Sequence, residues 1–122
     1  MFVDPKIEEI NKCPTQVLAI TESVSRLISD IRESVKKEQP SQFPLYIPRI
    51  GYLEDKITKQ TERIRSLIED VKADSRLLKD ADITVAVLEQ QISVLERDRT
   101  ELRNIKDSLS ESYSKLGSVS RF

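Results

Sequence analysis

The 122-residue sequence predicts an all-α, elongated protein, a helical hairpin with one long coiled-coil helix. Charged residues make up 34% of the chain and aromatic residues only 5%, with 2 Gly and no Trp, a composition typical of long helices. All five prolines lie within the first 48 residues, and neither proline nor glycine occurs between Tyr52 and Leu116. From Ile50 onward, apolar residues recur every seven positions. Together these observations predict helices on both sides of a proline-rich break.

Residues 1–15 are expected to form an N-terminal segment with a short helix. Asp4 followed by Pro5 is typical of a helix start, because the carboxylate caps free backbone N–H groups and proline suits the first helical position. The short helix should run to about Lys12, since Pro14 would interrupt it.

Residues 16–38 are predicted to form the first full helix. Apolar residues recur there at intervals of three and four, which places them on one face of a helix. Ile28 and Val35 widen this face toward the helix end. The face consists of Val17, Ile20, Val24, Leu27 and Ile31.

Residues 39–49 read as a proline-rich elbow. Pro40, Pro44 and Pro48 each lack a backbone donor and restrict the preceding residue, which argues against a helix. The segment is also unusually apolar, so we expect it to pack against another part of the protein. A proline-rich ligand for a small adaptor domain is the alternative. The apolar residues are Phe43, Leu45, Tyr46 and Ile47.

Residues 50–116 are predicted to form one long coiled-coil helix, because a strict seven-residue repeat indicates a left-handed supercoil with a partner helix. Gly117 is the expected stop, and residues 117–122 are expected to form a flexible tail. Residues 16–38 should fold back antiparallel along residues 50–72, leaving the distal half for partners. We call the apolar a and d positions the seam. Its a positions include Ile50, Ile57, Ile64, Val71, Leu78, Val85 and Ile92, and its d positions include Leu53, Leu67, Ala81, Leu88, Leu95, Leu102, Leu109 and Leu116.

Four polar residues interrupt the seam and are predicted to set its register: Gln60, Asp74, Arg99 and Lys106. In a parallel homodimer, Asp74 would face Asp74 and Arg99 would face Arg99, so other coiled-coil proteins are favoured over a second copy as partners. Long Arg and Lys side chains can also bend out of a seam, which weakens this argument. The predicted partner-binding residues are Val85, Leu88, Ile92, Leu95, Leu102 and Leu109.

Apolar residues also lie off the seam, where a two-stranded coiled coil would be polar. Ile83, Val87 and Val94 share a second face of the long helix. Around residues 77–95 we therefore expect the helix to contact more than one neighbour, as in a bundle.

The sequence offers little for catalysis. It has no histidine and no glycine-rich phosphate loop, and Cys13 is its one cysteine, so we expect no enzyme activity, no cofactor and no metal. The net charge of −1 gives no reason to expect nucleic acid as a partner. No apolar run reaches the length of a membrane span, and no signal-peptide pattern occurs, which predicts a cytoplasmic protein without direct membrane insertion. The serine-rich C-terminus is either a phosphorylation cluster or a fraying helix end.

The chain resembles the small coiled-coil subunits of the lysosome-related organelle biogenesis complex and of the related BORC complex, snapin-like proteins especially. The resemblance rests on the helix at 16–38, on the break PLYIP at 44–48, and on the helix that follows. The stretch from Val87 to Leu116 is similar to the last helix of such subunits. The resemblance implies a non-catalytic scaffold or adaptor subunit, peripheral on endosomes or lysosomes, that positions or sorts these organelles by recruiting partners.

Two other functions fit the same pattern. Kinetochore and spindle complexes use helical-hairpin subunits of similar size, and nuclear localisation would favour that class. A homodimeric coiled-coil spacer is the other alternative, which a stable and highly helical dimer of the purified chain would favour.

Overall fold

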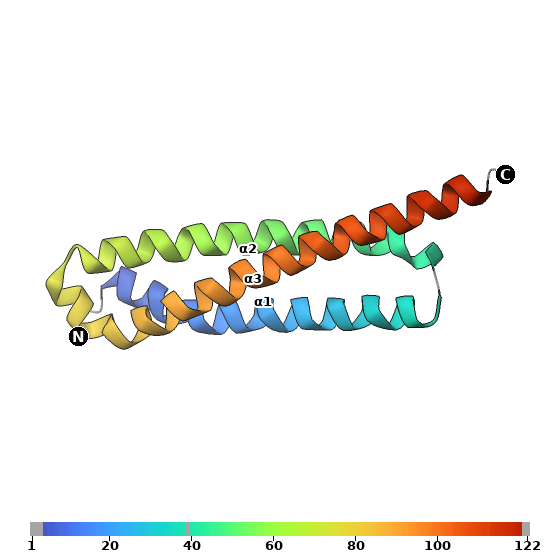
Figure 1. Ribbon diagram of the computed structural model, residues 1–122. Coiled ribbons are helices and arrows are strands. Elements are labelled where there is room, and N and C mark those ends of the chain that lie inside the picture. The colour runs from blue at the N-terminus through green and yellow to red at the C-terminus, as the bar shows by residue number, and fades with distance from the viewer. Residues whose placement is uncertain (1–3, 39, 121–122) are drawn as a thin grey trace.

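The computed structural model describes residues 4–38 and 40–120, and three α-helices account for most of them (Figure 1). They are α1 (Pro5–Lys36), α2 (Phe43–Lys72) and α3 (Ser75–Ser120), with a short 3-10 helix, η1 (Pro40–Gln42), between the first two. The described residues contain no strand, so the predicted all-α class is confirmed. The finer architecture differs from the expected hairpin with a free distal helix, because all three helices pack together.

Helix α1 runs unbroken through Pro14, so the predicted short helix ending near Lys12 is wrong. Its start is as expected, since the Asp4 side chain accepts a hydrogen bond of 2.9 Å from the Lys6 backbone N–H. A proline inside a helix costs about 3 kcal/mol through one lost hydrogen bond and a steric clash. Ile10, Cys13 and Val17, which surround Pro14, are almost completely buried in the core. Their burial offsets that cost.

The predicted elbow at 39–49 is shorter in the structure. The chain leaves α1 after Lys36, and α2 already begins at Phe43, seven residues before Ile50. Pro44 lies in the first turn of α2, where a helix has no use for a backbone donor. Pro48 lies inside α2 and removes one donor, near the end of the helix. The bend is therefore confined to residues 37–42.

The predicted helix at 50–116 is wrong as one element, because the chain turns at Ala73 and Asp74 and α3 starts at Ser75. The seam of α2 and the seam of α3 are buried against each other and against α1, which satisfies the long apolar stripe within one chain. Helix α3 also continues to Ser120, past the stop predicted at Gly117. Of the expected tail, residues 121–122 lie outside the described residues.

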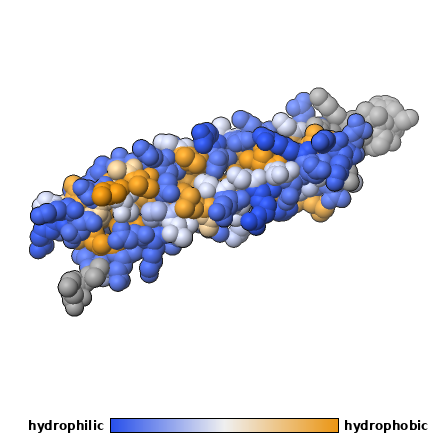
Figure 2. All heavy atoms as spheres, turned by 90° about the horizontal axis from the view of Figure 1, so that it is seen from below, coloured by the Kyte–Doolittle hydropathy of each residue, from blue (hydrophilic) through white to orange (hydrophobic). Residues whose placement is uncertain are grey.

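The bundle runs up, down and up, with α2 antiparallel to both other helices (Figure 1). Gln60 of α2 contacts Gln16 of α1, Lys72 of α2 contacts Glu89 of α3, and Thr84 of α3 contacts Asn11 of α1. The core lies between the helices, and the face seen in Figure 2 is mostly hydrophilic with separate apolar patches. At 1.5 Å per residue, 46-residue α3 is about 69 Å long and 32-residue α1 about 48 Å. Helix α3 therefore projects beyond the connection between α1 and α2 (Figure 1).

Candidate partner-binding surface

The six residues predicted to bind partners lie in the core of this chain. Leu88, Leu95 and Leu102 are completely buried, and Val85 and Leu109 are nearly so. Ile92 is half-buried and packs against the same core. A partner can contact these side chains only if α3 leaves the bundle, so the closed bundle presents a different surface.

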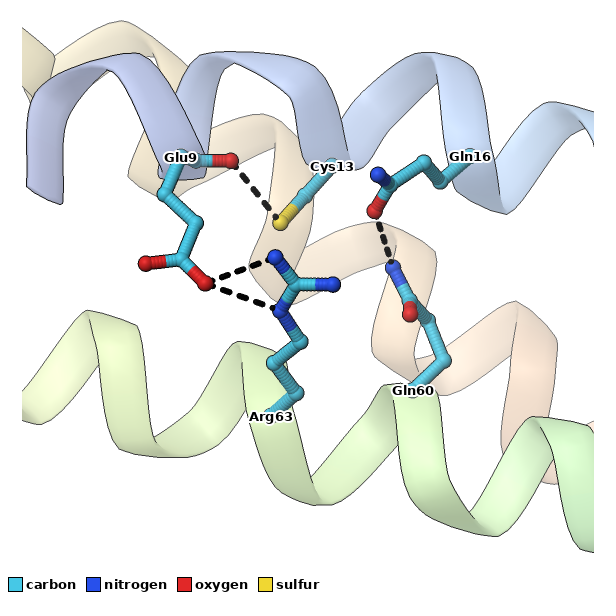
Figure 3. A network of polar contacts seen from close by, with 5 residues as sticks. All are labelled: Glu9, Cys13, Gln16, Gln60 and Arg63. Carbon is cyan, nitrogen blue, oxygen red and sulfur yellow. Dashed lines mark hydrogen bonds and ion pairs between the residues drawn. The ribbon is translucent and has the colours of Figure 1, made fainter. Parts of the chain in front are cut away.

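Of the four residues predicted to set the register of a coiled coil, Gln60 and Arg99 contact another helix of their own chain. The Gln60 amide donates a 2.9 Å hydrogen bond to Gln16 Oε1 on α1 (Figure 3). Arg99 Nη1 on α3 donates to Thr58 Oγ1 on α2 at 3.1 Å. Asp74 lies at the start of α3 and accepts from the Arg76 backbone N–H at 2.9 Å. Lys106 is half-buried on α3.

A polar network joins α1 and α2 around Cys13 (Figure 3). Arg63 donates to Glu9 Oε1 from Nη2 at 2.6 Å and from Nε at 3.1 Å, and the Cys13 thiol lies 3.4 Å from the Glu9 backbone carbonyl oxygen, to which it donates. Burial raises the pKa of Cys13, and the nearby Arg63 charge only partly opposes this. The thiol is therefore neutral near pH 7, and a neutral buried thiol is a poor nucleophile. The network connects two helices and offers no reactive group.

Charged side chains lie between α1 and α3 toward the end of the bundle where α1 connects to α2. Arg32 Nη2 and Glu101 Oε1 are 3.7 Å apart, with both side chains largely exposed, so this ion pair is weak. Asp98 is half-buried nearby, and burial raises its pKa, with the Arg97 charge opposing the rise and the Glu101 charge adding to it. These residues lie beside the groove described next.

A groove of about 460 Å³ opens between α1 and α3, at the end of the bundle where α1 connects to α2. Its walls are mainly apolar, and Val35 in the wall is 51% exposed. Exposed apolar surface of this kind, bordered by polar residues, is typical of a binding groove. The apolar residues of the groove are Ile31, Val35, Ile105 and Leu109, and the polar residues around it are Arg32, Lys36, Glu101, Asn104 and Ser108.

A second apolar surface lies on α3 close to its start. Ile83 is 77% exposed and Val87 is 41% exposed, one helical turn apart. In Figure 2 apolar side chains gather toward the end of the bundle where α2 turns into α3. Neither Ile83 nor Val87 lines the groove between α1 and α3, so this surface is separate from it.

Within residues 4–38 and 40–120, no group of three or more His, Cys, Asp or Glu side chains is placed to hold a metal ion. In the same part of the chain, none of the helices is long and apolar enough to cross a membrane.

Comparison with known proteins gives no relative to this bundle: no protein-family model, no curated protein and no solved structure matches the chain.

The sequence contained a signal for the groove that our site prediction did not use. Ile28 and Val35 widen the apolar face of α1 toward its end, beyond what packing on one neighbour needs. Ile105 lies just off the seam of α3. Their meeting depends on the turn at residues 73–74, which brings α3 back along α1, and the continuous heptad pattern gave no sign of that turn.

Proposed function

We propose that this chain is a non-catalytic adaptor subunit that binds an amphipathic helix of another protein in the groove between α1 and α3. The observation that carries the proposal is this apolar groove, in which Val35 is half-exposed while Ile31 and Leu109 are buried. Grooves of this kind bind helices through apolar residues spaced three and four apart.

The charges around the groove define the partner helix. The α1 side carries Arg32 and Lys36, and the α3 side carries Glu101. A fitting helix therefore has an apolar stripe, with acidic residues along the edge that faces α1 and a basic residue along the edge that faces α3. Such charges fix orientation and exclude wrong partners more than they add affinity.

The projecting end of α3 supports the same proposal. Helix α3 continues from Leu109, which lines the groove, to Ser120, and its last turns project past the connection between α1 and α2 (Figure 1). A partner helix in the groove can extend along this part of α3, which lengthens the contact beyond the groove itself.

For the cellular setting, the support is the resemblance of the chain to subunits of the lysosome-related organelle biogenesis complex and BORC. We propose a cytoplasmic complex of coiled-coil proteins that positions or sorts endosomes and lysosomes. The groove and the setting are separate proposals, since the groove would bind a helix in any compartment.

The experiment places a photo-cross-linking amino acid at Lys36, which borders the groove, and in a control chain at Leu45, which is 61% exposed on α2 outside the groove. A peptide of the segment cross-linked from position 36 is then titrated against the wild type, Val35→Glu and Leu45→Glu. We expect a helical peptide that binds Val35→Glu at least about tenfold more weakly and Leu45→Glu unchanged.

Circular dichroism checks that both variants are folded. Equal binding to the wild type and Val35→Glu would disprove the groove assignment. Cross-links from position 45 alone would do the same, and a cross-linked segment from a second copy of this chain would replace the hetero-oligomer with a homo-oligomer.

A further inference from the structure

The backbone of the turn between α2 and α3 has no conformation that forces the chain to bend. It consists of Ala73 and Asp74, and Ala73 has right-handed helical angles, with φ −70° and ψ −18°. Among the described residues, only Glu38 in the other connection combines a side chain with a positive φ. No glycine or proline occurs between Tyr52 and Leu116. A continuous helix through this turn would need no residue with an unfavourable backbone conformation.

The seam keeps one phase across the turn. Val71 ends the a positions of α2, and Leu78 and Val85 follow it at intervals of seven on α3. Two helices joined by a turn need no common phase, because the turn can rotate one relative to the other. A single helix with one buried stripe does need it. The shared phase therefore fits a second form in which α2 and α3 are one helix.

Straightening the turn would remove α3 from α1 and α2 of its own chain. It would expose the buried seam of α3, including Leu88, Leu95 and Leu102, together with the face that these residues cover. The faces of α1 and α2 that α3 had covered are complementary to the α3 of a second copy of this chain. Polar contacts between α2 and α3 would re-form in the same way between two chains, including Lys72–Glu89 at 3.0 Å and Arg99–Thr58 at 3.1 Å. The occupant is thus a second copy of this chain.

We infer that two copies of this chain exchange α3 through a hinge at residues 73–74, forming a domain-swapped dimer in which residues 43–120 are one helix. The closed monomer and the swapped dimer bury the same core side chains and differ mainly at the hinge. Exchange of an identical element is a known low-cost route to dimers. Protein concentration and the stability of the hinge turn decide which form predominates.

Asp74 holds the closed form. In the turn its side chain accepts the Arg76 N–H at 2.9 Å. In a straight helix the same residue would occupy a d position of the seam, where a carboxylate is unfavourable. One residue therefore both stabilises the turn and disfavours the continuous helix.

The test compares Asp74→Leu with Asp74→Ser by light scattering over a range of concentrations. Leu removes the cap and suits the seam, whereas Ser removes the charge and keeps a capping oxygen. Because two hinges open per dimer, loss of the caps should raise the association constant of Asp74→Leu on the order of 30-fold, and Asp74→Ser, which keeps a capping oxygen, should raise it much less. If Asp74→Leu does not fold, Asp74→Ala is used in its place.

A distance measurement separates swapping from simple surface association. Spin labels at Lys59→Cys and Thr100→Cys, in a Cys13→Ala background that also carries Asp74→Leu, report on α2 and α3 of one chain diluted into unlabelled protein. Both positions are exposed, and Thr58–Arg99 places them near each other in the closed form. We expect the distance to rise to about 62 Å in the dimer, since 41 residues of helix separate the labels. A monomeric Asp74→Leu, a dimer with the short distance, or equal dimerisation of Asp74→Ser would each overturn the inference.

Discussion

The connection from α1 to α2 and the connection from α2 to α3 both reverse the chain, but they are built differently. The first spans residues 37–42 and contains Glu38, with a φ of 55°, followed by the 3-10 helix η1. Phe43 is buried directly after it, and the Tyr46 hydroxyl lies 2.6 Å from the Ser34 hydroxyl on α1. The second spans only Ala73 and Asp74, without a positive φ.

The difference shows what fixes each reversal. Around the first connection, backbone conformation, Pro40 and local contacts all favour a bend. At the second, local support comes from the Asp74 cap and from two backbone bonds, Ala73 N–H to Glu69 at 3.0 Å and Asp74 N–H to Val71 at 3.2 Å. Most of the free energy that keeps α3 beside α2 must then come from the buried side chains along the helix.

The largest expected effect comes from removing that packing. Leu88→Asp with Leu95→Asp places two carboxylates where the side chains are completely buried, and should lower the free energy of unfolding by at least about 5 kcal/mol. This loss is comparable with the whole stability of a small domain, so we expect the bundle to unfold. Thermal unfolding followed by circular dichroism measures it.

The matched control is Gln90→Asp with Ser93→Asp, two exposed positions on the same stretch of α3. It should leave the melting curve almost unchanged. If the Leu88 and Leu95 variant melts as the wild type does, α3 is not held by its buried face, and the contrast between the two connections is wrong.

These two connections also explain which parts of the fold were predictable from sequence. The composition and the apolar spacing predicted the all-α class, and Asp4 and Pro5 identified the start of α1 correctly. Pro14 and Pro48 led to false breaks, because local proline rules do not include the burial of neighbours such as Ile10 and Val17.

The turn at residues 73–74 was missed because neither proline nor glycine marks it. An uninterrupted heptad pattern is the same whether the seam is buried by a partner or by the chain itself, and Asp74 was assigned to a seam position rather than to a helix cap. The sequence therefore identified the predicted contact residues as an apolar stripe that must be covered, but it did not show that helices of the same chain cover it. The groove could not be located until the packing of α1 against α3 was known.

The next largest effect compares glycine at the two connections. Glu38→Gly should raise the free energy of unfolding by about 0.5 to 1 kcal/mol, because glycine adopts a positive φ without the penalty of a side chain. Ala73→Gly should lower it by about the same amount, since Ala73 already has helical angles and glycine adds only entropy to the unfolded chain.

Urea unfolding of both variants measures the sign of each change in the free energy of unfolding, and each variant serves as the control for the other. Destabilisation by Glu38→Gly would mean that its side chain matters more than its backbone conformation. Stabilisation by Ala73→Gly would mean that the second turn is strained.

A similar effect is expected for the polar contact beside the first connection. Tyr46→Phe removes the hydroxyl that contacts Ser34, whose side chain is buried, and should cost about 1 kcal/mol of unfolding free energy. Tyr52→Phe is the matched control, because Tyr52 is 66% exposed and should be neutral. Equal effects in urea unfolding would show that the Ser34 contact does not hold α2 against α1.

The smallest effect concerns the pH dependence of the second connection. The Arg76 backbone N–H holds the pKa of Asp74 below its ordinary value, which is about 3.9, with the Arg76 charge and the Leu77 N–H acting in the same direction and desolvation opposing them. A carboxyl group whose pKa is lower in the folded state stabilises the fold fully above its unfolded pKa, and this contribution is lost as the pH falls through the folded pKa.

Asp74→Asn keeps a capping oxygen that does not titrate, so the comparison isolates this charge. Urea unfolding of both proteins between pH 5 and pH 2 should show that the advantage of the wild type is constant above about pH 4 and shrinks below it. The other carboxyl groups titrate in both proteins and cancel in the difference. A difference that stays constant over this range would mean that the Asp74 charge does not stabilise the turn. The hinge would then depend on the shape of the cap and on the packing of α3 alone.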